Sequence, residues 1–205
     1  MARNKRPVAE RDDAAGSVRI IGGELRGRRL EFAPDPRTRP MKDRVRETLF
    51  DLLGMRVKGA IALDLFAGSG AIGFEALSRG AARVVLVERH FPTADALRRS
   101  ARSLGVTDRA EVRTGDVLLW AKRLPDAPAP LPTTAPWIVF ISPPWEFFTS
   151  RRDEVMGLVA ALERAAPAGS TIVVEADAAF DPEALPGPAA WDTRPIPPAV
   201  LYLTE

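Results

Sequence analysis

From residue 60 onward, short apolar segments alternate with segments of helical periodicity, and this alternation restricts the possible folds more than any other feature. The strand-like segments are residues 60–67, 82–88, 110–116, 137–142 and 170–176. The helix-like segments are residues 70–80, 93–105, 117–124 and 151–165. Strands that are apolar throughout are buried on both faces, and strand–helix–strand units bring consecutive strands into a parallel sheet. The sequence therefore predicts an α/β fold with a mostly parallel, Rossmann-like sheet and helices on both faces.

The first 54 residues do not follow this alternation. Residues 1–16 lack periodicity, which predicts a disordered tail. Residues 17–54 are expected to form a small extension, made of a hairpin and a helix. The main domain is then expected over residues 55–205.

Within the extension, β-forming residues and glycine pairs predict a hairpin that turns at residues 21–24. A helix is predicted over residues 43–54, with Asp43 as its N-cap. Arg44 and Arg46 lie off the apolar stripe of this helix, so we expect both side chains to face solvent or a ligand.

Two later segments interrupt the alternation. Residues 125–136 are rich in proline, which excludes a central strand or a helix and predicts an exposed loop. Residues 189–205 contain two β-like segments that meet at the sequence PIPP, residues 195–198. An antiparallel pair of strands at the end of the sheet is the expected result.

Charge and composition narrow the possible partners. Residues 1–47 hold 13 Lys and Arg against 8 Asp and Glu, whereas the whole chain has a net charge of only +2. A basic region rich in arginine is typical of proteins that bind nucleic acid, although a solvated arm that aids solubility has the same composition. The chain has no cysteine and a single histidine, His90, so it lacks the residues for a thiolate or histidine metal site. It also has no apolar run of about 18 residues and no secretory signal, so we expect a soluble, cytoplasmic monomer that binds no metal and no membrane.

The segment between the first predicted strand and helix of the main domain contains a glycine-rich loop. Gly68, Gly70 and Gly73 form a G-x-G-x-x-G pattern, and Glu88 ends the following strand. Such a loop lets the backbone approach a ligand at a helix N-terminus, and a carboxylate in the position of Glu88 can bind ribose hydroxyls. The pattern thus favours a nucleoside cofactor, while a tight turn with an exposed glutamate remains the alternative.

Acidic residues near this loop favour one cofactor over another. Asp64 precedes the first glycine by four residues, and a carboxylate there suits a cationic ligand and repels a pyrophosphate. S-adenosylmethionine carries a sulfonium and an ammonium group, so the sequence favours it over NAD. Asp116 lies at the end of the third strand, where it can accept a hydrogen bond from adenine, cap the next helix, or do both.

A second loop, Ser142-Pro143-Pro144-Trp145, follows the fourth strand. It is expected at the same end of the sheet as the glycine loop, because the carboxyl ends of parallel strands share one edge. In enzymes that methylate amino groups of nucleic-acid bases, Asp or Asn usually precedes such a Pro-Pro pair.

The chain resembles the RsmD family of bacterial methyltransferases, which modify guanine N2 in 16S ribosomal RNA. The motifs that carry the resemblance are RIIGGELRGRRL, RPMKDRVRETLFDLL, LDLFAGSGAIGFEALSRGA and IVFISPPW. The resemblance implies a seven-stranded class I S-adenosylmethionine-dependent methyltransferase fold with an N-terminal RNA-binding extension. It also implies ribosomal RNA or an assembling small ribosomal subunit as the partner.

Site residues follow from this resemblance together with the motifs. Those expected to bind the cofactor are Asp64, Phe66, Ala67, Gly68, Ser69, Gly70, Glu88, Arg89, Gly115, Asp116 and Val117. Those expected to hold and methylate the base are Ser142, Pro143, Pro144 and Trp145. Those expected to bind RNA are Arg19, Arg26, Arg28, Arg29, Arg39, Lys42, Arg44 and Arg46.

Ser142 departs from the Asp of the family pattern. A hydroxyl can accept a hydrogen bond from the amine but brings no charge, and the loss of that charge corresponds to roughly a 5- to 150-fold slower reaction. Glu146 is a nearby carboxylate that could compensate. The alternatives are a weakened homologue that binds RNA, which Ser142→Asp should reactivate, a DNA amino-methyltransferase, and an NAD-dependent dehydrogenase. Met41 and Lys42 also differ from the R-P-T that usually precedes the DRVRE helix, and Lys42 adds a cation.

Overall fold

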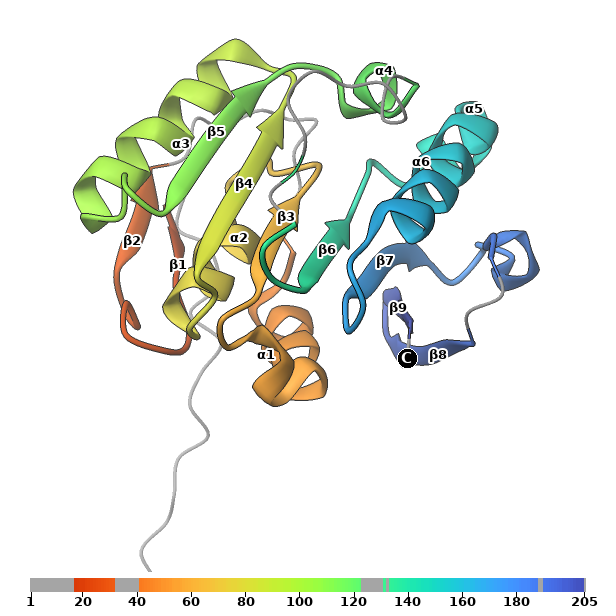
Figure 1. The fold of residues 1–205 in the computed structure, drawn as a ribbon, viewed down its shortest axis with the longest axis horizontal. Helices are drawn as coiled ribbons and strands as arrows, with labels where there is room; N and C mark the ends of the chain where they lie inside the picture. Colours follow the sequence, from red (N-terminus) through yellow and green to blue (C-terminus); the bar gives the residue numbers. More distant parts are fainter. Residues whose placement is uncertain (1–16, 32–40, 123–130, 132, 188–189, 205) are drawn as a thin grey trace, which may run out of the picture.

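A computed structural model describes residues 17–31, 41–122, 131, 133–187 and 190–204, which form a seven-stranded sheet with helices on both faces (Figure 1). The strand order is β5-β4-β3-β6-β7-β9-β8. The strands are β3 (Ile61–Asp64), β4 (Arg83–Glu88), β5 (Ala110–Thr114), β6 (Trp137–Ile141), β7 (Thr171–Asp177), β8 (Trp191–Ile196) and β9 (Ala199–Thr204). The first five are parallel, and β9 pairs antiparallel with both β7 and β8. The predicted parallel sheet and the predicted antiparallel pair at its end are both confirmed.

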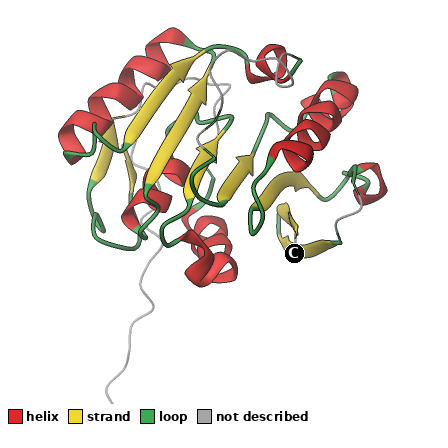
Figure 2. Cartoon of the chain, viewed as in Figure 1, coloured by secondary structure: helices red, strands yellow, loops and turns green. Residues whose placement is uncertain are grey.

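Helices cover both faces of this sheet, as the apolar strands predict (Figure 2). The helices are α1 (Asp43–Leu53), α2 (Ala71–Ser78), α3 (Phe91–Leu104), α4 (Val117–Ala121), α5 (Phe147–Ser150) and α6 (Arg152–Ala165), with 3₁₀ turns η1 (Gly54–Val57) and η3 (Pro182–Ala184). Helices α1, α2 and α3 pack into one core cluster, and α4, α5 and α6 pack into the other. Neighbouring residues of β3 alternate between the two clusters, with Ala62 in the first and Leu63 in the second.

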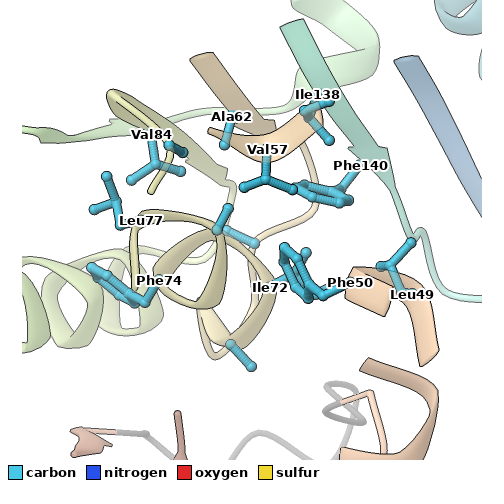
Figure 3. Packing of buried hydrophobic residues seen from close by; sticks show 14 of the residues in the cluster. Leu49, Phe50, Val57, Ala62, Ile72, Phe74, Leu77, Val84, Ile138 and Phe140 are labelled. Carbon is cyan, nitrogen blue, oxygen red and sulfur yellow. The ribbon is translucent and has the colours of Figure 1, made fainter. Parts of the chain in front are cut away.

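The first core cluster joins α1 to the sheet (Figure 3). Phe50 of α1 contacts Phe140 of β6, with ring centroids 5.8 Å apart. Val45, Leu49 and Leu53 of the predicted apolar stripe are buried, and α1 ends at Gly54 as predicted. The extension is therefore packed against the main domain through an ordinary apolar helix face.

The hairpin of the extension forms, but not with the predicted turn. Strands β1 (Ser17–Arg19) and β2 (Arg29–Glu31) pair antiparallel, and the chain turns over residues 23–28 rather than 21–24. The reason is a docking contact with α2, because the backbone N–H of Glu24 donates to the carbonyl of Ser78 at 2.8 Å. Gly23 has φ 75°, and a Cβ there would lie 1.8 Å from that same carbonyl oxygen. Contact with α2 therefore determines the shape of this connection.

Two predictions for α1 are wrong. Lys42 occupies the N-cap position, and Asp43 instead accepts hydrogen bonds from Arg19 and Arg46. Arg46 is fully buried, although its position off the apolar stripe had predicted an exposed side chain. Its guanidinium donates to the carbonyl oxygens of Met41 and Arg19 and lies 3.7 Å from the carboxylate of Glu75. Arg46 is therefore an internal link of the extension and not a surface contact for RNA.

The tail (1–16), Arg39 and most of the proline-rich segment lie outside the described residues. Within the described part of the chain, no helix has the length and apolarity that a membrane span needs. Within the same ranges, no group of three or more His, Asp or Glu residues is arranged to hold a metal ion.

Candidate active site

A cavity of about 370 Å³ lies at the carboxyl ends of the central strands. The chain runs outward from β3 to β4 and β5, then returns to the other side of β3 as β6, so the strand order reverses between β3 and β6. In open α/β sheets the crevice at this reversal is the usual ligand site. The loops after β3, β4, β5 and β6 all contribute to the cavity lining, as the sequence predicts.

The glycine loop and Glu88 form one wall. Gly70 precedes α2 with φ 75°, and its N–H donates to the carbonyl of Ala67 at 2.7 Å, which closes a tight turn. The carboxylate of Glu88 accepts hydrogen bonds from the N–H of Gly68 at 2.9 Å and from that of His90 at 2.8 Å. Glu88 thus fixes the loop and also borders the cavity, so its structural role and its predicted ligand role are compatible.

Asp64 lies behind the glycine loop and does not line the cavity. Its side chain is buried, and one carboxylate oxygen accepts a hydrogen bond from the N–H of Gly73 at 3.0 Å. Burial raises the pKa of Asp64 to about 7, the Gly73 hydrogen bond opposes the shift, and the negative charge of Glu88 adds to it. Gly70 is also absent from the lining, so the geometry does not support direct ligand contacts for these two residues.

Gly115, Asp116 and Val117 border the same end of the cavity, beside Glu88 and Arg89. Asp116 caps α4 by accepting a hydrogen bond from the N–H of Leu118 at 2.8 Å, so the capping interpretation is confirmed. Its second oxygen lies 3.3 Å from Arg151.

Sequence reasoning missed Arg151 and Phe147. The guanidinium groups of Arg89 and Arg151 lie 5.5 Å and 5.2 Å from the ring centroid of Phe147, which lines the cavity. The predicted site loop ends at Trp145, two residues before Phe147. An aromatic residue so close to the SPPW loop was the signal that could have extended the search.

Ser142, Pro143, Pro144 and Trp145 also line the cavity, as predicted from the strand order. The loop is braced by a hydrogen bond from the N–H of Phe147 to the carbonyl of Pro144 at 2.8 Å. The hydroxyl of Ser142 lowers the pKa of the carboxyl group of Glu175 on β7, against the larger upward shift from burial, and Glu175 also lines the cavity. Glu175 was missed because it lies inside the mostly apolar β7 with no motif around it. Glu146, the predicted substitute carboxylate, also borders the cavity but is exposed.

The N-terminal extension contributes Met41, Lys42 and Val45 to the lining. Most of the cations predicted to bind RNA are exposed, and these are Arg19, Arg26, Arg28, Arg29, Lys42 and Arg44. Arg19 pairs with Asp43 at 3.1 Å, and Arg28 donates to the carbonyl of Ser103. Lys42 is therefore the one member of this group that borders the cavity.

Comparison with known proteins identifies the family. A family model described as "Conserved hypothetical protein 95" matches residues 18–192. The chain is 39% identical over 131 residues to "Ribosomal RNA small subunit methyltransferase D" of Escherichia coli strain K12, which covers 64% of this chain and 62% of that protein. The match thus spans less than two thirds of the length of this relative.

Solved structures agree with the fold. "Putative methyltransferase yhhF" from Escherichia coli superposes with a TM-score of 0.71 at 32% identity, covering 92% of this chain and 97% of that one. An RNA methyltransferase from Salinibacter ruber, solved in complex with S-adenosyl-L-homocysteine, shares the fold with a TM-score of 0.57 at 23% identity over 81% of this chain and 92% of that one. The fold is thus that of the class I methyltransferases. Because the family model matches most of the chain, the protein belongs to the conserved hypothetical protein 95 family, the RsmD family that its sequence motifs resemble.

Proposed function

We propose that this protein uses S-adenosylmethionine to methylate the exocyclic N2 amine of a guanine in small-subunit ribosomal RNA. The main support for this proposal is the cavity at the place where the strand order reverses. The glycine loop and the SPPW loop both line this cavity. The first loop suits a nucleoside cofactor and the second suits a flat base. The name of the Escherichia coli relative supports ribosomal RNA as the substrate.

The residues around the glycine loop fit S-adenosylmethionine. Glu88 ends β4, Asp116 follows the neighbouring β5, and the cavity lining also includes the apolar side chains of Phe66 and Val117. Both oxygens of Glu88 already accept a backbone N–H, and a carboxylate still has acceptor positions left for ribose hydroxyls. Negative charge in the lining suits the two cationic groups of the cofactor. The cofactor supplies an electrophilic methyl group to this site.

The SPPW loop fits the methyl acceptor. The indole of Trp145 offers a broad face on which an extruded base can stack. The two prolines restrict the backbone of the loop, so the base plane is held in one orientation. The hydroxyl of Ser142 has lone pairs that accept a hydrogen bond from the amine. Holding the methyl donor and the methyl acceptor in line within one cavity accounts for a large share of the rate enhancement in such transfers.

Residues 17–54 form the RNA-binding part of this proposal. The exposed arginines of the hairpin and of α1 provide cations for phosphate groups, and Lys42 lies where the extension meets the cavity. Arg46 is excluded from this role by its burial. Phosphate contacts of this kind orient the RNA without reading its sequence.

The proposal is tested with S-adenosylmethionine labelled at its methyl group. The acceptors are small ribosomal subunits that lack the modification and, in a second arm, the naked RNA from the same particles. Label found on guanine N2 by mass mapping supports the proposal, and the more active arm identifies the form of the substrate. A protein that binds the cofactor yet labels neither acceptor contradicts it.

Replacing Trp145 with alanine should slow methyl transfer about 5- to 150-fold, because loss of base stacking costs about 1–3 kcal/mol. The measurement is the single-turnover rate with saturating cofactor. Trp191→Ala is the matched control, since Trp191 is a half-buried tryptophan of β8 that does not border the cavity. Equal losses in the two variants would mean that Trp145 acts only through general packing.

Replacing Lys42 with alanine should weaken RNA binding and lower the slope of log K against log salt concentration by about 1, as expected for one lost phosphate contact. Lys58→Ala is the control, because this exposed lysine precedes β3 at the opposite end of the sheet. Filter binding over a range of salt concentrations measures both slopes. A slope unchanged in Lys42→Ala removes this residue from the RNA surface.

A further inference from the structure

Ser142 and Glu175 stand side by side because of the register of two parallel strands. The last paired residues of β6 and β7 are Ile141 and Val174, so the next residue on each chain is Ser142 and Glu175. Both residues border the cavity, and the hydroxyl of Ser142 lowers the pKa of the Glu175 carboxyl group, as a neighbouring donor does. A carboxylate therefore lies next to the position at which the SPPW loop lacks its usual acid.

Glu175 is on the face of β7 that points toward α1. Val173, two residues earlier on the same strand, belongs to the core cluster that contains α1, whereas Val174 belongs to the other cluster. Val45 of α1 and Ala199 of β9 border the cavity on this side. Glu88 ends β4 and Asp116 follows β5, and both strands lie on the other side of β3 from β6 and β7. Glu175 therefore borders the cavity from the side of the sheet opposite to Glu88 and Asp116.

In the described part of the chain, no Lys or Arg forms an ion pair with the carboxyl group of Glu175. No Lys or Arg of this part lowers its pKa. Burial raises the pKa of Glu175, and only the hydroxyl of Ser142 opposes this shift. A carboxyl group that is kept partly desolvated and is not neutralised by an ion pair is suited to accept a proton. In contrast, Glu154 in the neighbouring α6 is paired with Arg151 and Lys122.

We propose that Glu175, held by the hydroxyl of Ser142, is the catalytic carboxylate that binds the amine of the target base and accepts its proton. This role rests on the proposed methyltransferase function. The serine donates its single O–H to Glu175 and keeps its lone pairs, so the pair presents only hydrogen-bond acceptors to the cavity. Such a pair selects a ligand with N–H donors, which an exocyclic amine provides and a carbonyl oxygen does not.

A new bond forms between the amine nitrogen and the methyl carbon, while the bond from that carbon to sulfur breaks and its electron pair stays on sulfur. The nitrogen becomes positively charged and loses one proton to the carboxylate of Glu175, which later releases it to solvent. A neutral methylated amine remains.

The test compares two conservative variants, Glu175→Gln and Glu183→Gln. Glu175 borders the cavity, whereas Glu183 is an exposed residue of η3 that does not border it. Glu175→Gln should lower kcat at least about 100-fold, the usual loss for a general base, with cofactor binding unchanged. Glu183→Gln should stay within about threefold of the parent protein. A Glu175→Gln protein with parental kcat, or equal losses in both variants, overturns the assignment.

A rescue experiment separates catalysis from structure. Adding Ser142→Asp to Glu175→Gln supplies a carboxylate from the neighbouring strand, so kcat should recover by about tenfold or more over Glu175→Gln alone. In the parent background, Ser142→Asp should not raise kcat, because it puts two carboxylates in contact. Increased activity of that single variant would overturn the proposal and favour the view that the serine merely weakens the enzyme.

A folding defect in Glu175→Gln and an inactive parent protein each have a different consequence for the proposal. If Glu175→Gln does not fold, Ser142→Ala takes its place, since loss of the hydroxyl should lower kcat about tenfold with no change in cofactor affinity; an unchanged kcat overturns the role of the pair. If the parent protein itself transfers no methyl group to small-subunit RNA, the proposed function fails and this role fails with it. A parent protein that is active while Glu175→Gln is equally active refutes only the role of Glu175.

Discussion

Replacing Glu75 with glutamine should lower the free energy of unfolding by about 3–5 kcal/mol, the usual cost of removing one partner from a buried ion pair. Glu75 of α2 has no exposed surface, and its carboxylate accepts hydrogen bonds from the backbone N–H of Ile21 at 2.8 Å and of Gly22 at 2.7 Å. It also binds Arg79 at 2.8 Å and lies 3.7 Å from the buried guanidinium of Arg46. All of these groups are donors, so the NH₂ group of a glutamine would face another donor.

The same substitution should loosen the N-terminal extension, because Glu75 joins both its hairpin connection and α1 to the main domain. Urea unfolding measures the free energy, and hydrogen exchange of the amides of Ile21 and Gly22 measures the local effect. Glu47→Gln is the control, since Glu47 lies on the exposed face of α1 and should change the stability by less than about 0.5 kcal/mol. A loss below about 1 kcal/mol in Glu75→Gln would mean that the extension is held mainly by its apolar contacts.

The architecture could be predicted from the sequence because it depends on periodicity. Strands buried on both faces are apolar at every position, and the helices between them have one apolar stripe. These two patterns determine which segments pair and at which sheet edge their loops meet. The convergence of the glycine loop, Glu88, Asp116 and the SPPW loop on one cavity follows from that edge alone.

The direction of individual side chains could not be predicted so well. Arg46 was assigned to the surface because its helix face was judged by apolar residues only. Its long side chain instead meets Glu75, which is 29 positions later in the sequence. Asp64 was assigned to the ligand because it is close to the glycine loop in sequence, yet it points to Gly73 in α2. Glu175 became visible only when the register of β6 and β7 was known. Each of these cases depends on a contact between segments that are distant in sequence.

The second large effect comes from the titration of Asp64. The free energy of unfolding should fall between pH 5 and pH 8, and Asp64→Asn should remove this loss. The pKa of Asp64 is raised from 3.8 to about 7, with burial as the main cause. In this window the folded protein therefore binds a proton that the unfolded chain has released. Stability is then greatest at low pH and falls as the pH rises through about 7. Over two pH units of this window, the free energy of unfolding falls by about 3 kcal/mol.

The quantity to measure is the free energy of unfolding of the wild type minus that of Asp64→Asn, at pH 5 and at pH 8. This difference should fall by about 3 kcal/mol from pH 5 to pH 8, because asparagine keeps an acceptor for the N–H of Gly73 but does not titrate. Subtraction removes the contribution of all other titrating groups. Asp95→Asn, on the exposed face of α3, should follow the wild-type curve. If the difference does not change with pH, Asp64 is ionised throughout, and its negative charge is then available behind the glycine loop for the cationic cofactor.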